Sequence, residues 1–196
     1  KNENLLKFGS VAVNCNPITK GHLHLIKYAA KAVDFLYVLV IEEDKSKFSF
    51  KDRLYLVKKA CSELHNVKVI KGGKFVCTEY ILPEYFYKDK YNSEDIDISM
   101  EAYFFGEHIA PCLEVKKIFL GDEPICKVTN SYNKQMSKMM ESYDIKVEII
   151  DRISNTDGDL ISASTVRKLL DQRQFTELKK FLPSTIIDDV IKIYFQ

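Results

Sequence analysis

Residues 8–22 read FGSVAVNCNPITKGH, an apolar run that leads into a turn containing proline and glycine. The run Phe8–Cys15 is typical of a buried β-strand, and the segment Gly21–Val33 has the spacing of a helix. Pro17 fixes its own φ and lacks an N–H, which suits a sharp exit from a strand. Gly21 lacks a Cβ, so a ligand can approach the backbone closely. This stretch therefore predicts a strand, a tight turn and a helix whose start can face a ligand.

The same alternation of short apolar runs and longer amphipathic segments continues along the chain, without an internal repeat. It predicts parallel strands joined by crossover helices, and hence an α/β fold with a doubly wound sheet. Such sheets bind ligands at the carboxyl ends of their strands, near the topological switch point. Further strands are expected at Phe35–Ile41, Val67–Ile70, Lys117–Leu120 and Lys146–Ile150, and helices at Ser49–Leu64, Thr129–Ser142 and from Ser162 onward, with a break at Pro183.

Size and composition favour a single domain, residues 1–196, that acts on small molecules. Hydrophobic residues make up 46% of the 196 and charged residues 29%, and the net charge is +1. A charge this small creates no global field that would attract nucleic acid or a membrane surface, and neither is expected as a partner. No apolar run reaches the roughly 18 residues that span a bilayer. The five cysteines are odd in number and form no C-x-x-C, which predicts reduced thiols and a cytoplasmic location.

The turn after the first predicted strand carries groups that suit a phosphate. The free N–H groups and the dipole at the start of a helix favour an anion. His22 falls in the first turn of that helix, where an imidazole can donate a hydrogen bond to oxygens that gain charge as phosphorus becomes five-coordinate. The glycines of a P-loop or a G-x-G-x-x-G loop are missing. Taken alone, a Gly-His pair is also compatible with a purely structural histidine.

A second candidate motif, ISASTVR, occupies residues 161–167. Ser162 and Ser164 open another predicted helix, and Arg167 falls near its first turns. Serine hydroxyls and helix-start N–H groups can hold phosphate oxygens, and a guanidinium can grip a polyphosphate. The alternative is a serine-capped helix with a surface arginine.

The two motifs together, T-x-G-H at 19–22 and I-S-x-S-x-x-R at 161–167, resemble the paired signature of the nucleotidyltransferase superfamily. That superfamily includes phosphopantetheine adenylyltransferase and the cytidylyltransferases. The resemblance implies a Rossmann-like sheet. It also implies that His22 stabilises the transition state while Ser162, Ser164 and Arg167 hold the nucleotide phosphates.

A narrower resemblance is to the C-terminal domain of citrate lyase ligases. It rests on blocks spread over most of the chain: NCNP at 14–17, EDKSKF at 43–48, DRL at 52–54, IAP at 109–111, GDEP at 121–124, VT at 128–129 and YN at 132–133. Complete citrate lyase ligases usually carry an acetyltransferase-like domain before this one, and that domain is absent from residues 1–196. Residue 1 is Lys rather than Met, which suggests a trimmed start or a start inside a longer protein.

The ligase resemblance implies a reaction and a set of site residues. Acetate would attack the α-phosphate of ATP, and the acetyl group would pass to the thiol prosthetic group of the citrate lyase acyl-carrier subunit. Mg²⁺ would be carried mostly by the phosphates, without a dedicated protein metal site. The implied catalytic residues are His22, Lys45 and Arg167, and the implied nucleotide-binding residues are Asn14, Asn16, Pro17, Thr19, Gly21, His22, Gly121, Asp122, Glu123, Ile161, Ser162, Ser164 and Arg167.

Several alternatives stay open from the sequence. Either Lys45 or Lys47 would offset the phosphate charge, and each is also compatible with a solvated surface lysine. The chain could be another adenylyl- or cytidylyltransferase, such as phosphopantetheine adenylyltransferase, or a non-catalytic nucleotide-binding module. The aromatic segment Lys71–Ser99 is expected to be an insertion packed on the sheet, where it either fills the core or shapes an acceptor pocket.

Overall fold

The computed structural model describes residues 6–43, 45–83, 96–122, 126–155 and 157–196. Its five strands form one parallel sheet in the order β3-β2-β1-β4-β5. The strands are β1 (Phe8–Val13), β2 (Phe35–Val40), β3 (Val67–Lys71), β4 (Val115–Gly121) and β5 (Lys146–Ile150). The predicted α/β class with a parallel, doubly wound sheet is therefore confirmed.

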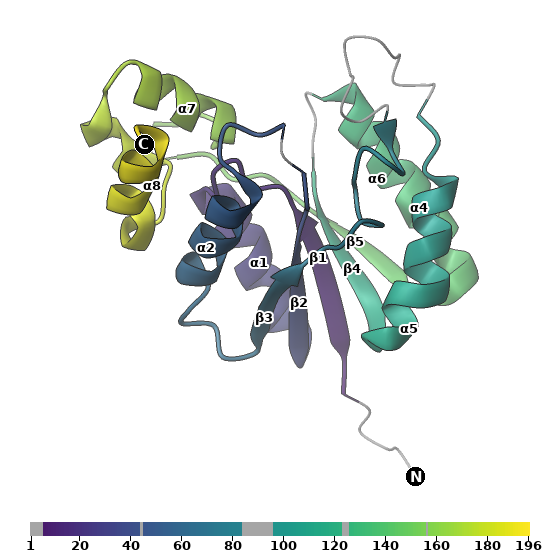
Figure 1. The fold of residues 1–196 in the computed structure, drawn as a ribbon. Coiled ribbons are helices and arrows are strands. Elements are labelled where there is room, and N and C mark those ends of the chain that lie inside the picture. Colours follow the sequence, from purple (N-terminus) through teal and green to yellow (C-terminus); the bar gives the residue numbers. More distant parts are fainter. Residues whose placement is uncertain (1–5, 44, 84–95, 123–125, 156) are drawn as a thin grey trace.

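Helices cover both faces of this sheet (Figure 1). One face packs against α1 (Lys20–Ala32), α2 (Phe50–Ala60), α7 (Ala163–Asp171) and α8 (Ile187–Tyr194), and the other against α4 (Ser99–Phe104), α5 (Ala110–Cys112) and α6 (Lys127–Met140). A π-helical turn, Phe105–Ile109, joins α4 to α5, and 3₁₀ turns occupy Glu141–Tyr143, Phe175–Lys180 and Ser184–Ile186. None of the helices in the described ranges is long and apolar enough to cross a membrane.

The order of the strands places the switch point at the carboxyl ends of β1 and β4. The chain runs outward from β1 through β2 to β3, and then returns to the other side of β1 to form β4 and β5. The loops that follow β1 and β4 therefore diverge from each other, which opens space between them. Asn14 follows β1 and Asp122 follows β4, so both sequence blocks quoted above reach this point.

Side-chain caps fix the starts of three helices. The hydroxyl of Thr19 accepts from the backbone N–H of His22, that of Ser49 from Asp52, and that of Ser162 from Thr165. An N-cap of this kind satisfies one of the backbone donors that a helix start leaves unpaired. The predicted start of α2 at Ser49 is confirmed, but the helix ends at Ala60 rather than near Leu64.

The run from Ser99 to Cys112 is helical, which the sequence analysis did not predict. The described part of the insertion before it packs on the sheet as expected, because Val76 and Leu82 are buried together with Leu39 of β2. The ring of Phe75 stacks on that of Phe104 at 4.4 Å between centroids. The insertion aromatics Tyr85, Phe86, Tyr87 and Tyr91 lie outside the described residues.

Candidate active site

A cavity of about 690 Å³ opens at the carboxyl ends of β1, β4 and β5, between the starts of α1 and α7. It brings together both sequence motifs, although they lie at opposite ends of the chain. Pro17 and Lys45 do not line the cavity, and Glu123 lies outside the described residues. The predicted site residues that do line it are Asn14, Asn16, Thr19, Gly21, His22, Gly121, Asp122, Ile161, Ser162, Ser164 and Arg167.

His22 is held in one tautomer by the start of its own helix. Its Nδ1 accepts the backbone N–H of Thr19 at 3.1 Å and lies 2.8 Å from the Thr19 hydroxyl. A ring nitrogen that accepts a backbone N–H cannot also carry a proton, so the proton sits on Nε2. Burial lowers the pKa of His22 to about 4, and the positive charge of Arg152 contributes to the shift. At neutral pH the cavity therefore contains a neutral imidazole whose Nε2–H is a hydrogen-bond donor.

The turn between β1 and α1 is fixed from both of its sides. Cys15 adopts a positive φ of 54°, and the peptide bond between Asn16 and Pro17 is cis. The Asn16 carbonyl accepts from Nη1 of Arg167 at 2.6 Å, while its side-chain Oδ1 accepts the backbone N–H of Phe48 at 3.1 Å. Arg167 of the second motif therefore contacts the turn that leads into the first motif.

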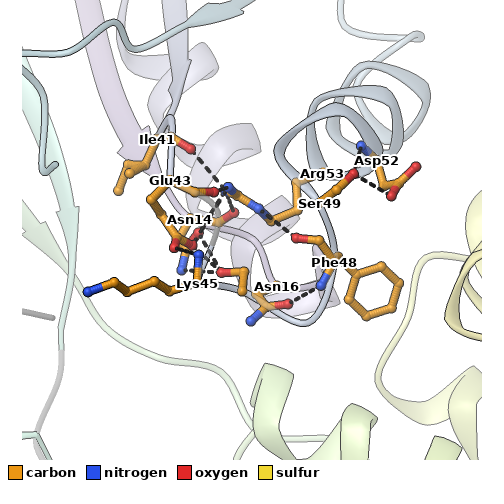
Figure 2. Close-up of polar contacts among 10 residues, drawn as sticks. Asn14, Asn16, Ile41, Glu43, Lys45, Phe48, Ser49, Asp52 and Arg53 are labelled. Carbon is orange, nitrogen blue, oxygen red and sulfur yellow. Dashed lines mark hydrogen bonds and ion pairs between the residues drawn. The ribbon is translucent and has the colours of Figure 1, made fainter. Parts of the chain in front are cut away.

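Arg53 is a buried residue whose guanidinium contacts this turn at Asn14, as Figure 2 shows. Its guanidinium donates to the backbone carbonyls of Asn14, Ile41, Glu43 and Phe48, and to Oδ1 of Asn14 at 2.7 Å. The carboxylate of Glu43 lies 3.6 Å from it. These partners come from the loops after β1 and β2, so one side chain ties both loops together.

Arg53 belongs to the DRL block, and no role was predicted for it. An arginine on an amphipathic helix is usually a solvated residue, and only its complete burial reveals its function. The Glu43 carboxylate also accepts from the Ser46 hydroxyl and from the Lys45 backbone N–H. The start of the EDKSKF block is thus fixed by the same cluster.

Both candidate lysines of the EDKSKF block point away from the cavity in this structure. Nζ of Lys45 forms an ion pair with Glu79 at 2.6 Å, and the Lys45 side chain extends away from the Arg53 cluster in Figure 2. Nζ of Lys47 lies 4.8 Å from the ring centre of Tyr194, on the C-terminal helix. The structure therefore does not bring either lysine to the cavity, and the role of Lys45 stays a prediction.

The start of α7 presents a cluster of hydroxyls to the cavity. The Ser162 hydroxyl lies 2.9 Å from that of Ser164 and 2.8 Å from that of Thr165. A Cβ added at Gly21 would lie 3.5 Å from the Ile161 carbonyl, so the starts of α1 and α7 adjoin closely. Two helix starts with their backbone N–H groups converge on one space, an arrangement that favours an anion.

The β4 and β5 side of the cavity is also tied together. The backbone N–H of Asp122 donates to the Ile150 carbonyl at 2.8 Å, and Nε of Arg152 donates to the Asp122 carbonyl at 3.0 Å. The buried Asn133 donates to the Gly121 carbonyl at 3.0 Å. Arg152 was not predicted as a site residue, because a lone arginine after a strand forms no motif.

Cys15 lines the cavity but is not a nucleophile in this environment. Burial raises the pKa of its thiol well above the usual value, and the neighbouring Cys61 raises it further. The thiol is therefore protonated at neutral pH. Within the described residues, no group of three or more histidine, cysteine or acidic side chains is placed to hold a metal ion.

Comparison with known proteins identifies the family of this chain. The protein family described as citrate lyase ligase C-terminal domain matches residues 8–189. The chain belongs to this family. A [citrate [pro-3S]-lyase] ligase from Haemophilus influenzae is 31% identical over 93% of the chain, and one from Klebsiella pneumoniae is 32% identical over 90%. The chain spans 56% and 53% of those two proteins, or about half their length.

More distant relatives share the fold of this family. A phosphopantetheine adenylyltransferase from Streptococcus sanguinis is 31% identical over 61% of the chain and 74% of that protein. A nicotinate-nucleotide adenylyltransferase-like protein from Vibrio parahaemolyticus superposes with a TM-score of 0.60 at 13% identity, covering 97% of this chain and 96% of that one. Thermotoga maritima TmcAL bound with alpha-thio ATP gives 0.58 at 12% identity, covering 95% and 56%. At these identities the two structures support the fold alone.

Proposed function

We propose that this domain binds ATP in the cavity and catalyses the attack of acetate on its α-phosphate, as the first half of a citrate lyase ligase reaction. An acetate oxygen forms a bond to the α-phosphorus, the bond from that phosphorus to the bridging oxygen breaks, and pyrophosphate leaves. In the second half, the thiol prosthetic group of the citrate lyase acyl-carrier subunit attacks the acetyl carbonyl. The carbon–oxygen bond to AMP then breaks, and the thiol proton is released to solvent.

The observation that carries the proposal is the neutral His22 between the two helix starts. Its Nε2–H is a donor in a cavity lined by the hydroxyls of Ser162 and Ser164 and by Arg167. The acetate carboxylate is already a nucleophile, so the protein has only to position the reactants and stabilise the developing charge. His22 would donate to an α-phosphate oxygen, while the start of α7 would hold the outer phosphates.

Mg²⁺ fits this site as a companion of the nucleotide. Asp122 and Asp151 line the cavity, but no set of three or more potential ligands is gathered among the described residues. Magnesium usually keeps few protein ligands and is held largely by phosphate oxygens. The ion would neutralise charge on the departing pyrophosphate, and Asp122 and Asp151 are the cavity carboxylates that could add a ligand.

The test is pyrophosphate release from ATP with a series of acids. Acetate should support release, and acetyl-AMP should stay bound until a thiol acceptor arrives. Butyrate should react poorly, because an enclosed pocket rejects added methylenes, each worth about 1–3 kcal/mol.

A phosphopantetheine adenylyltransferase is also among the sequence relatives, so 4′-phosphopantetheine is run in parallel as the competing acceptor. In that reaction a phosphate oxygen replaces the carboxylate as the nucleophile at the same α-phosphate. Pyrophosphate release with 4′-phosphopantetheine and none with any short carboxylic acid would refute the ligase proposal and favour the adenylyltransferase.

A further inference from the structure

Arg152 occupies a position in the cavity that the two sequence motifs leave unassigned. It lies two residues beyond the end of β5, is half-buried, and lines the same cavity as His22 and Ser162. Its Nε–H donates to the Asp122 carbonyl at 3.0 Å, so the end of β4 fixes the plane of the guanidinium. The entropy cost of ordering this side chain is therefore met before any ligand binds. A preorganised side chain of this kind loses less entropy when a ligand binds.

Arg152 is also close enough to His22 to act on it electrostatically. Burial is the main reason for the low pKa of His22, and the Arg152 charge lowers that pKa further. The other described charged groups that line the cavity are Asp122, Asp151 and Arg167. Because Nδ1 of His22 accepts a backbone N–H, only the neutral ring keeps this bond, and a nearby cation favours the neutral ring.

Arg167 supplies only one positive charge for a triphosphate. One of its terminal nitrogens, Nη1, donates to the Asn16 carbonyl at 2.6 Å. The hydroxyls of Ser162 and Ser164 are neutral donors. A second guanidinium in the cavity therefore supplies the charge that the outer phosphates need, and its planar fork matches phosphate oxygens.

We propose that Arg152 contacts the phosphates of the bound nucleoside triphosphate, as a second guanidinium acting together with Arg167. The inference rests on the proposed function only in taking ATP as the ligand. It adds a residue from the segment after β5 to a phosphate site otherwise built from the starts of α1 and α7. The same charge holds His22 in the neutral form that donates through Nε2.

Two substitutions separate the charge of Arg152 from its shape. Arg152→Gln removes the charge, whereas Arg152→Lys keeps the charge but loses the planar fork. Lys168→Gln is the matched control, because Lys168 lies on the exposed face of α7 outside the cavity and its loss changes the net charge equally. Binding of ATP and of adenosine is measured by calorimetry, and the His22 ring is titrated by NMR in the ligand-free protein.

Arg152→Gln should weaken ATP about tenfold or more and change adenosine affinity less than twofold, which also shows that the variant is folded. Arg152→Lys should fall between Arg152→Gln and the wild type for ATP. The pKa of His22 should rise in Arg152→Gln and stay near the wild-type value in Arg152→Lys. An ATP affinity within twofold of wild type in Arg152→Gln, or an unchanged His22 titration, would overturn the inference.

Neither measurement requires turnover. Failure of acetate to support pyrophosphate release would refute the proposed reaction and leave the assignment of Arg152 intact. Conversely, if the protein is a fully active ligase and Arg152→Gln leaves its ATP affinity unchanged, only this inference is refuted.

Discussion

Replacing Arg53 by methionine should remove a large part of the stability of the fold. Methionine fills a similar volume but leaves three buried carbonyls without a donor, those of Ile41, Glu43 and Phe48. Each orphaned buried acceptor costs about 1–3 kcal/mol, and breaking a buried ion pair, here with Glu43, costs about 3–5 kcal/mol. These costs overlap because the loops relax, so we expect a loss of about 4–5 kcal/mol in the free energy of unfolding. Typical domains have only about 5–15 kcal/mol in total.

The assay is urea unfolding of the Arg53→Met and Arg53→Lys variants. Lysine keeps the charge opposite Glu43 but offers fewer donors, so it should lose about half as much stability as methionine. Lys51→Met on the exposed side of the same helix is the control and should change the free energy of unfolding by less than about 0.5 kcal/mol. A loss below about 1 kcal/mol for Arg53→Met would show that the loops after β1 and β2 do not depend on this guanidinium.

Three further predictions concern the cavity itself. His22→Ala should leave ATP affinity nearly intact and lower turnover a hundredfold or more, which corresponds to a loss on the order of 3 kcal/mol of transition-state stabilisation. A near-normal steady-state rate would show that His22 does not stabilise the transition state. Arg167→Ala should weaken ATP more than AMP in calorimetry, with Arg167→Lys a partial rescue, and equal losses for both nucleotides would place Arg167 away from the outer phosphates. The pKa of His22 is lowered from 6.5 to about 4 in the folded protein. As the pH falls, the imidazole therefore becomes protonated at a higher pH in the unfolded chain than in the folded protein. Stability should therefore fall as the pH drops from about 6.5 through about 4, by at most about 3 kcal/mol, and His22→Gln should flatten this part of a pH series of urea unfolding curves.

The sheet was predictable because its strands are parallel and covered on both faces. Such strands consist of nearly continuous apolar residues, and the predicted run Phe35–Ile41 differs from β2 by one residue. The first predicted strand, Phe8–Cys15, extends too far because the chain leaves the sheet after Val13 and turns through a positive φ at Cys15. A backbone turn of this kind leaves no mark on an apolar pattern.

The helical run from Ser99 to Cys112 was missed for a tertiary reason. It contains Gly106 and Pro111, which normally indicate a break. A Cβ at Gly106 would lie 2.4 Å from the ring of Tyr143, so the glycine is required by a side chain far along the chain rather than by a turn. The sequence around Gly106 contains no sign of that contact.

The same distinction separates the parts of the site that were predicted from those that were not. His22, Thr19 and Ser162 lie at the starts of their own helices, so their positions at the cavity follow from local spacing. Arg53 and Arg152 act on carbonyls that lie up to 39 and 30 positions away in the sequence. A pattern of neighbouring residues cannot indicate such partners, and each arginine alone resembles an ordinary surface residue.

The position of His22 therefore depends on contacts well outside its own motif. The turn that leads into α1 is held at Asn14 by Arg53, and at Asn16 by Arg167 and by the Phe48 backbone. Thr19 follows that turn, and its N–H orients the imidazole through Nδ1. A change in the segment before α2 or in α7 is thus transmitted to the Nε2–H donor through a few hydrogen bonds of 2.6–3.1 Å. Because of this coupling, the geometry at His22 depends on both motifs and on the Arg53 cluster between them. This is a physical reason why the three occur together in one chain.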